Sequence, residues 1–183
     1  MHTLYGKELM ESGDYQKAEV IYYDGVNMPK SYGEAKTFFN QEAHIFYYLG
    51  TLYEKQGDSK KANNTFKEAA VYKAAVSEIS LFRALALIKL GNNEEANNVL
   101  KEMLTVADNF IVNKDLRTYY GVGSPSPMPF EYNIEKNNLT DGYILKAYAL
   151  LGYGKISEAE TTMEEARKLN PYDFRIFAFD RIK

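Results

Sequence analysis

The residues that could carry out chemistry in this chain are few and widely spaced. The 183-residue sequence has no cysteine and only two histidines, His2 and His44. A zinc site built from two such distant histidines and carboxylates would need the fold to bring them together. His2 lies at the start of the sequence, and His44 can face a groove or solvent on an expected helix. We therefore expect no metal ion and no cofactor.

No combination of residues predicts a catalytic centre. No grouping of serine, histidine and aspartate can be argued from spacing. The segment Gly121–Ser124 has two glycines but lacks the lysine and the strand-to-helix context of a phosphate-binding loop. Glu94–Glu95 and Glu164–Glu165 are most simply solvated carboxylates on helices, favourable near a helix start. The sequence therefore predicts a protein that is not an enzyme.

Composition limits the classes of partner. Hydrophobic residues make up 45% of the chain and charged residues 26%, which allows a continuous core with a polar exterior. The net charge of −3 argues against nucleic acid as a partner, because non-specific nucleic-acid binding needs clustered lysine and arginine. There is no basic and apolar leader and no apolar run of ~18 residues. We expect no membrane contact and a cytoplasmic location.

A helix–turn–helix pattern organises the chain and is clearest in residues 46–70. Apolar and small residues recur there at the three- and four-residue spacing of a helix face, at Phe46, Leu49, Gly50 and Tyr53 and then at Ala62, Phe66 and Ala69. Small residues let two helix axes approach, and the rings fill the space beside them. We therefore expect an all-α fold of stacked helix pairs.

Four such units can be placed in one domain that spans residues 1–183. We expect repeats at about residues 3–29, 43–74, 77–108 and 140–171, a long irregular loop at 117–138 and a capping helix at 172–183. The turn glycines are unevenly spaced, and only the interval from Gly57 to Gly91 matches a ~34-residue period. We therefore expect an insertion at 30–43. The loop holds three of the five prolines, so no helix should persist through it.

The repeated order of small residue, aromatic residue and turn glycine resembles the tetratricopeptide repeat (TPR) family, most strongly in the second and fourth units. The resemblance implies a superhelical array whose inner surface holds an extended peptide or a partner protein. The order of Tyr47–Gly50, Phe66–Ala70 and Tyr119–Pro125 is also similar to the C-terminal helical arm of uncharacterised bacterial proteins with a mutarotase-like β-sandwich domain. Ser126–Pro129 departs from that pattern. This second resemblance implies a helper arm of a carbohydrate-active protein.

The TPR resemblance implies a groove formed by the first helix of each pair. The residues expected to face it are His44, Tyr47, Thr51, Glu54, Leu81, Leu85, Ile88, Ile144, Tyr148 and Leu151. This surface lacks the Lys, Asn and Arg set with which TPR domains hold a C-terminal carboxylate, so we do not expect it to capture a chaperone tail. Two alternatives stay open, since the groove is either free or covered by the 117–138 loop. Self-association through an apolar patch is a further hypothesis.

Overall fold

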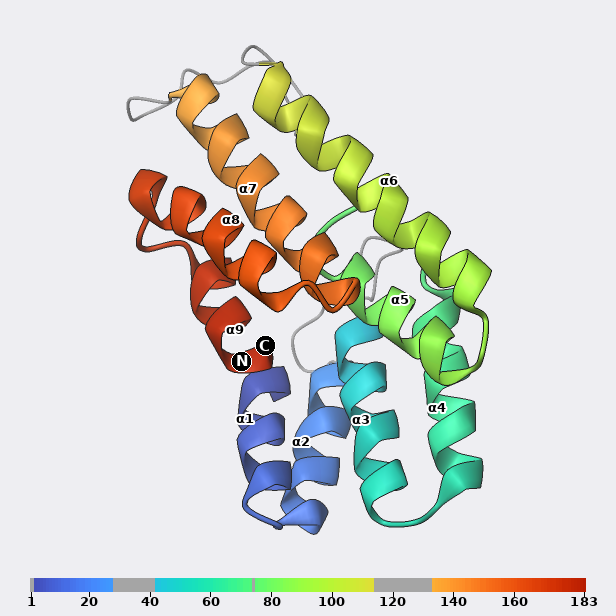
Figure 1. The fold of residues 1–183 in the computed structure, drawn as a ribbon. Coiled ribbons are helices and arrows are strands. Elements are labelled where there is room, and N and C mark those ends of the chain that lie inside the picture. The colour runs from blue at the N-terminus through green and yellow to red at the C-terminus, as the bar shows by residue number, and fades with distance from the viewer. Residues whose placement is uncertain (1, 28–41, 74, 114–132) are drawn as a thin grey trace, which may run out of the picture. The chain divides into compact units, whose positions relative to one another are not determined.

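The computed structural model describes residues 2–27, 42–73, 75–113 and 133–183. Within these ranges the regular secondary structure is α-helical, with no strand, which confirms the predicted all-α fold. The helices are α1 (His2–Glu11), α2 (Tyr15–Val26), α3 (Ala43–Lys55), α4 (Ser59–Val71), α5 (Ser80–Lys89), α6 (Asn93–Val112), α7 (Ile134–Gly152), α8 (Ile156–Leu169) and α9 (Phe174–Ile182) (Figure 1).

The chain divides into two compact units, residues 1–102 and 103–183, and α6 contributes residues to both. In the first unit α1 pairs with α2 and α3 pairs with α4. Helix α3 packs against both α1 and α2, and α5 packs against both α3 and α4. In the second unit α7 pairs with α8, and α9 packs against both. In each of these cases a helix that follows a pair contacts both members of that pair.

Four tight turns between consecutive helices share one backbone conformation. Each contains a glycine with a left-handed φ, which is 86° at Gly13, 80° at Gly57, 80° at Gly91 and 71° at Gly154. The residue after the glycine donates its N–H to a carbonyl in the last turn of the preceding helix, as Asp58 does to Tyr53 at 2.9 Å. This is a Schellman-type helix end, which favours glycine because a Cβ is strained at that φ.

Helix α7 begins earlier than expected. The side chain of Asn133 accepts a hydrogen bond from the N–H of Lys136 at 2.9 Å and so caps the helix that starts at Ile134. Pro129 is the last proline before this point, so no proline ring prevents helix formation here. The loop prediction of 117–138 is therefore wrong for residues 134–138, and the repeat predicted from 140 starts too late. The rest of the loop, and most of the insertion expected at 30–43, lie outside the described residues.

The closest fit within the helix pairs is a ring seated against a glycine. A Cβ added at Gly50 would lie 2.5 Å from Cε1 of Phe66, and one added at Gly6 would overlap the ring of Tyr22. The exposed fraction is 1% for Phe66 and 0% for Tyr22. Since the interior of a protein is close-packed, these rings fix the distance between the two helices of each pair.

We predict that Gly50→Ala lowers the free energy of unfolding by about 1 kcal/mol or more, measured by chemical denaturation. Alanine normally stabilises a helix by up to ~1 kcal/mol relative to glycine, so a net loss would come from overlap of the new methyl group with the Phe66 ring. Asn63→Ala, on the exposed face of α4, is the control and should change stability little.

The two helices joined at Gly91 suggest a compensating variant. Counted from the turn glycine, Ala84 and Leu100 take the positions of Gly50 and Phe66. The double variant Gly50→Ala/Phe66→Leu should therefore lose less than the sum of its two single changes, because the smaller side chain makes room for the methyl group. A Gly50→Ala variant that is as stable as the unmodified chain would show that the ring and the glycine are not tightly fitted.

Candidate functional site

Five of the predicted groove residues lie together on α3 and α5 of the first unit. Tyr47, Thr51 and Glu54 follow one another on α3 at the spacing of a single helix face. Leu85 and Ile88 lie on α5, which packs against α3. We call the surface formed by these five residues the α3–α5 face.

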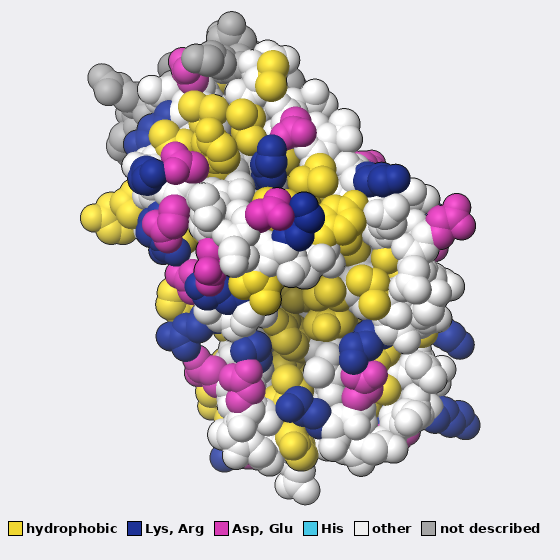
Figure 2. Space-filling model, in the orientation of Figure 1, with side chains coloured by type: hydrophobic (Ala, Val, Ile, Leu, Met, Phe, Trp, Pro, Cys, Tyr) yellow, Lys and Arg dark blue, Asp and Glu magenta, His cyan; other side chains and the backbone are white. Residues whose placement is uncertain are grey.

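The α3–α5 face combines apolar side chains with one ion pair. Ile88 is 42% exposed, whereas Tyr47 and Leu85 are half-buried. Lys89 Nζ donates to Glu54 Oε2 at 2.6 Å and so links α5 to α3. Figure 2 shows hydrophobic side chains over α1 to α3 with Lys, Arg, Asp and Glu on both sides of them. An exposed ion pair stabilises the fold little, so its polar atoms remain available to a ligand.

Three buried aromatic rings pack against the ring of Tyr47. Its ring centroid lies 5.5 Å from that of Tyr48, 5.9 Å from that of Phe66 and 5.8 Å from that of Phe82. These separations are in the favourable range for aromatic pairs. Tyr48, Phe66 and Phe82 are buried, so the partly exposed Tyr47 is held in one orientation. A fixed aromatic side chain loses little conformational entropy when a ligand binds it.

His44 belongs to the same aromatic cluster but is less accessible. Its ring centroid lies 6.0 Å from that of Phe82, and its Nδ1 atom is buried with no hydrogen-bond partner among the described residues. Burial lowers the pKa of His44 from 6.5 to about 4, so the imidazole is neutral at pH 7. The side chain therefore contributes mainly to packing at the start of α3.

Three of the residues predicted to face the groove are placed in the core instead. The exposed fractions are 1% for Leu81, 1% for Ile144 and 2% for Tyr148. The hydroxyl of Tyr148 donates to the Arg175 carbonyl at 2.8 Å, because α9 packs on α7. Leu151, the remaining predicted residue, is half-buried on α7 in the second unit. Helical spacing predicted which helices would line the groove, but it did not predict which face of each helix is exposed.

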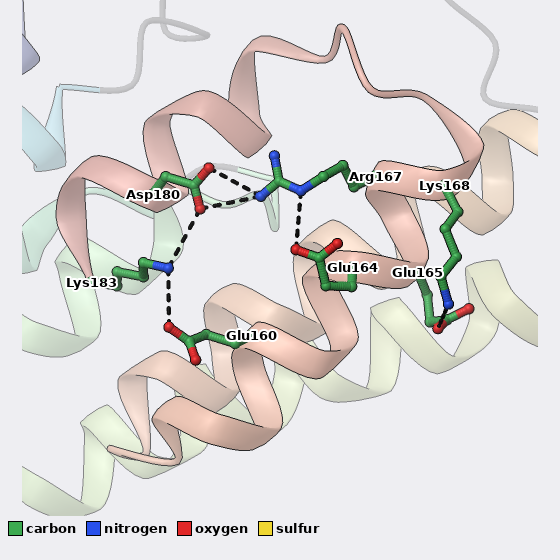
Figure 3. A network of polar contacts seen from close by, with 7 residues as sticks. All are labelled: Glu160, Glu164, Glu165, Arg167, Lys168, Asp180 and Lys183. Carbon is green, nitrogen blue, oxygen red and sulfur yellow. Dashed lines mark hydrogen bonds and ion pairs between the residues drawn. The ribbon is translucent and has the colours of Figure 1, made fainter.

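A concave region lies between α8 and α9 and was missed by the sequence analysis. It is a pocket of about 360 Å³ lined by Glu160, Thr161, Met163, Glu164, Arg167, Phe179, Asp180 and Lys183. All five of its charged residues form one chain of contacts (Figure 3). The only sequence signal was the alternation of charge along the two helices.

The cations of this pocket are already paired. Arg167 Nη2 donates to both carboxylate oxygens of Asp180, at 3.0 and 3.2 Å, and its Nε donates to Glu164 at 3.1 Å. Lys183 Nζ lies 3.0 Å from Glu160 and 3.6 Å from Asp180. An anionic ligand would have to displace these carboxylates. The pocket is therefore a poorer candidate site than the α3–α5 face.

Two further observations on the described residues concern metal ions and membranes. No three His, Asp or Glu side chains within the described ranges are grouped so that they could hold a metal ion. None of the helices in those ranges is both long enough and apolar enough to cross a membrane. Comparisons with protein-family models, with curated proteins and with solved structures found no match. The function must therefore be argued from the side chains of the site.

We predict that the free energy of unfolding falls by on the order of 3 kcal/mol as the pH drops from 6.5 to 4, through His44 alone. The pKa of His44 is about 4 in the folded chain, against 6.5 ordinarily, so between these pH values the unfolded chain binds more protons. The contribution is complete above pH 6.5 and is lost as the pH falls. Chemical denaturation of the unmodified chain and of His44→Leu at several pH values would measure it.

His44→Leu should flatten the pH dependence of the unmodified chain between pH 6.5 and 4. Equal slopes for the unmodified chain and His44→Leu would mean that His44 becomes protonated in the folded state as readily as in the unfolded one.

Proposed function

We propose that this chain is a non-catalytic, TPR-like interaction module that binds an extended peptide, or a segment of a partner protein, on the α3–α5 face. The observation that carries the proposal is the position of Tyr47, a partly exposed ring supported by three buried rings. Rigid aromatic residues beside apolar contacts are the usual centres of binding energy in protein interfaces.

The helix packing supports the TPR-like part of the proposal. Helices α3 and α5 each contact both helices of the pair before them, and the four turns end their first helices in the same way. In such an array the first helices line one surface and the second helices another. Tyr47 and Ile88 both lie on first helices, where an extended segment could contact consecutive pairs.

The side chains of the α3–α5 face define the chemistry of the expected ligand. Leu85, Ile88 and the ring of Tyr47 would contact an apolar side chain of the ligand. The Glu54–Lys89 ion pair would meet a polar or zwitterionic group, since it offers both an acceptor and a donor. The hydroxyl of Thr51 donates to the Tyr47 carbonyl at 3.0 Å and keeps a lone pair that can accept a peptide N–H. We therefore expect a short segment with an apolar residue next to a polar one.

A random peptide array would test this proposal with the purified chain as the probe. We predict that bound peptides share an apolar position and that Ile88→Asp and Tyr47→Ala each weaken their binding by about tenfold or more, equal to ~1.4 kcal/mol or more. The affinities would be measured by calorimetry on the synthesised peptides.

A matched substitution outside the site completes the test. Val71 at the end of α4 is 66% exposed and is not a residue of the α3–α5 face, so Val71→Asp introduces the same charge elsewhere on the first unit and should leave binding unchanged. Because Ile88 is exposed, Ile88→Asp should fold normally even if Tyr47→Ala does not. The proposal fails if no peptide binds, or if the selected peptides bind Ile88→Asp and the unmodified chain equally well.

A further inference from the structure

The first helix pair has an apolar face that no other described helix of the first unit covers. A pocket of about 230 Å³ between α1 and α2 is lined by Tyr5, Leu9, Gln16, Lys17, Val20 and Ile21. Val20 is 59% exposed and Tyr5 is 51% exposed. A cluster of exposed apolar side chains of this kind marks a surface for contact with another molecule.

The helix-pair fold itself does not require an apolar residue at the position of Val20. Counted from the turn glycine, the same position in the other three second helices is occupied by Asn64 in α4, Asn98 in α6 and Thr161 in α8. Asn64, Asn98 and Thr161 are all polar and exposed. The valine of α2 is therefore a feature of the first pair alone, and its apolar surface needs a separate explanation.

Three exposed residues and one half-buried residue of α2, Ile21, form a self-complementary strip. Lys17, Val20, Ile21 and Asp24 recur at three- and four-residue spacing and so share one helix face. We call these four residues the α2 strip. It has a cation at one end, two apolar residues in the middle and a carboxylate at the other end. Lys17 has a side chain that is 72% exposed, and Asp24 is exposed as well.

Two copies of this strip match when they run antiparallel. A two-fold axis that passes between Val20 and Ile21 places Val20 against Ile21 of the partner subunit. The same axis places Lys17 beside Asp24 of the partner subunit, and the contact occurs twice because the axis repeats it. Lys17 already lies 2.9 Å from Asp14, but this exposed ion pair contributes little to stability. Lys17 can therefore pair with Asp24 of the partner subunit instead.

We propose that the α2 strip is the interface of a symmetric homodimer, in which two copies of α2 pack antiparallel. The occupant of the apolar face is thus a second copy of the chain, selected by the charge pattern of the strip. The dimer is weak, because one helix face buries less surface than the interfaces of stable complexes. This inference does not depend on peptide binding at the α3–α5 face.

Sedimentation velocity over a range of concentrations tests the dimer. The unmodified chain should show a concentration-dependent monomer–dimer equilibrium. Val20→Asn introduces the residue that α4 carries at the same position and should weaken dimerisation by about tenfold or more. Val71→Asn is the control, because Val71 is 66% exposed at the end of α4 and lies outside the α2 strip.

Charge reversal tests the two-fold arrangement directly. Lys17→Asp alone sets aspartates against each other at both ends of the interface, and Asp24→Lys alone sets lysines against each other. Each variant should therefore be monomeric where the unmodified chain dimerises. A 1:1 mixture of the two variants should form a heterodimer, because every contact then joins an aspartate to a lysine. All four changed or tested positions are exposed, so circular dichroism should show unchanged helix content.

Several outcomes would overturn the proposal. The unmodified chain does not form this dimer if it stays monomeric at roughly 100 times the protein concentration used in the calorimetric measurement of peptide binding. A dimer that survives Val20→Asn uses another surface. A mixture of Lys17→Asp and Asp24→Lys that stays monomeric would show that the two residues do not meet across a two-fold axis, and a different protein would then have to cover this face.

Discussion

The fit of an aromatic ring against a glycine is the constraint on which the first two helix pairs depend. Gly50 and Gly6 have no side chain, so Phe66 and Tyr22 can lie directly against the backbone of the partner helix. Each ring then excludes water from the contact and sets the separation of the two helices. Where the first-helix residue is alanine, as at Ala84, the second helix carries the smaller Leu100 at the corresponding position. The smallest residue on the first helix, glycine, thus goes with a large ring on the second helix, and the larger alanine goes with the smaller leucine.

Contacts between successive pairs include hydrogen bonds between side chains as well as ring contacts. The hydroxyl of Tyr53 donates to Glu19 at 2.6 Å and lies 3.1 Å from the hydroxyl of Tyr23, which joins α3 to α2. Hydrogen bonds of this kind have directional requirements that apolar contacts lack. They therefore favour one register between successive pairs, whereas ring and glycine contacts decide how closely paired helices approach.

The candidate binding surface depends on the same core. Tyr47 is useful to a ligand because Tyr48, Phe66 and Phe82 hold its ring, and Phe66 is the ring that is seated against Gly50. Packing and binding are therefore linked through one residue that takes part in both. The buried Nδ1 of His44 shows the cost of this arrangement, since no described residue supplies the hydrogen bond that this atom would have in water.

The sequence by itself determined the helices and their turns. Small and aromatic residues at helical spacing, followed by a glycine, are local signals, and local signals suffice to predict a helix pair and a left-handed turn. Their limit is visible at α7, where three prolines suggested a longer loop than Asn133 and Ile134 allow. Only the tertiary structure decided which helix faces are covered. Tyr148 is buried because α9 packs on α7, whereas Val20 is exposed because no other described helix of the first unit covers that side of α2. Burial depends on the neighbours that a helix acquires when the pairs pack together, and that information is not contained in the spacing of residues along one helix.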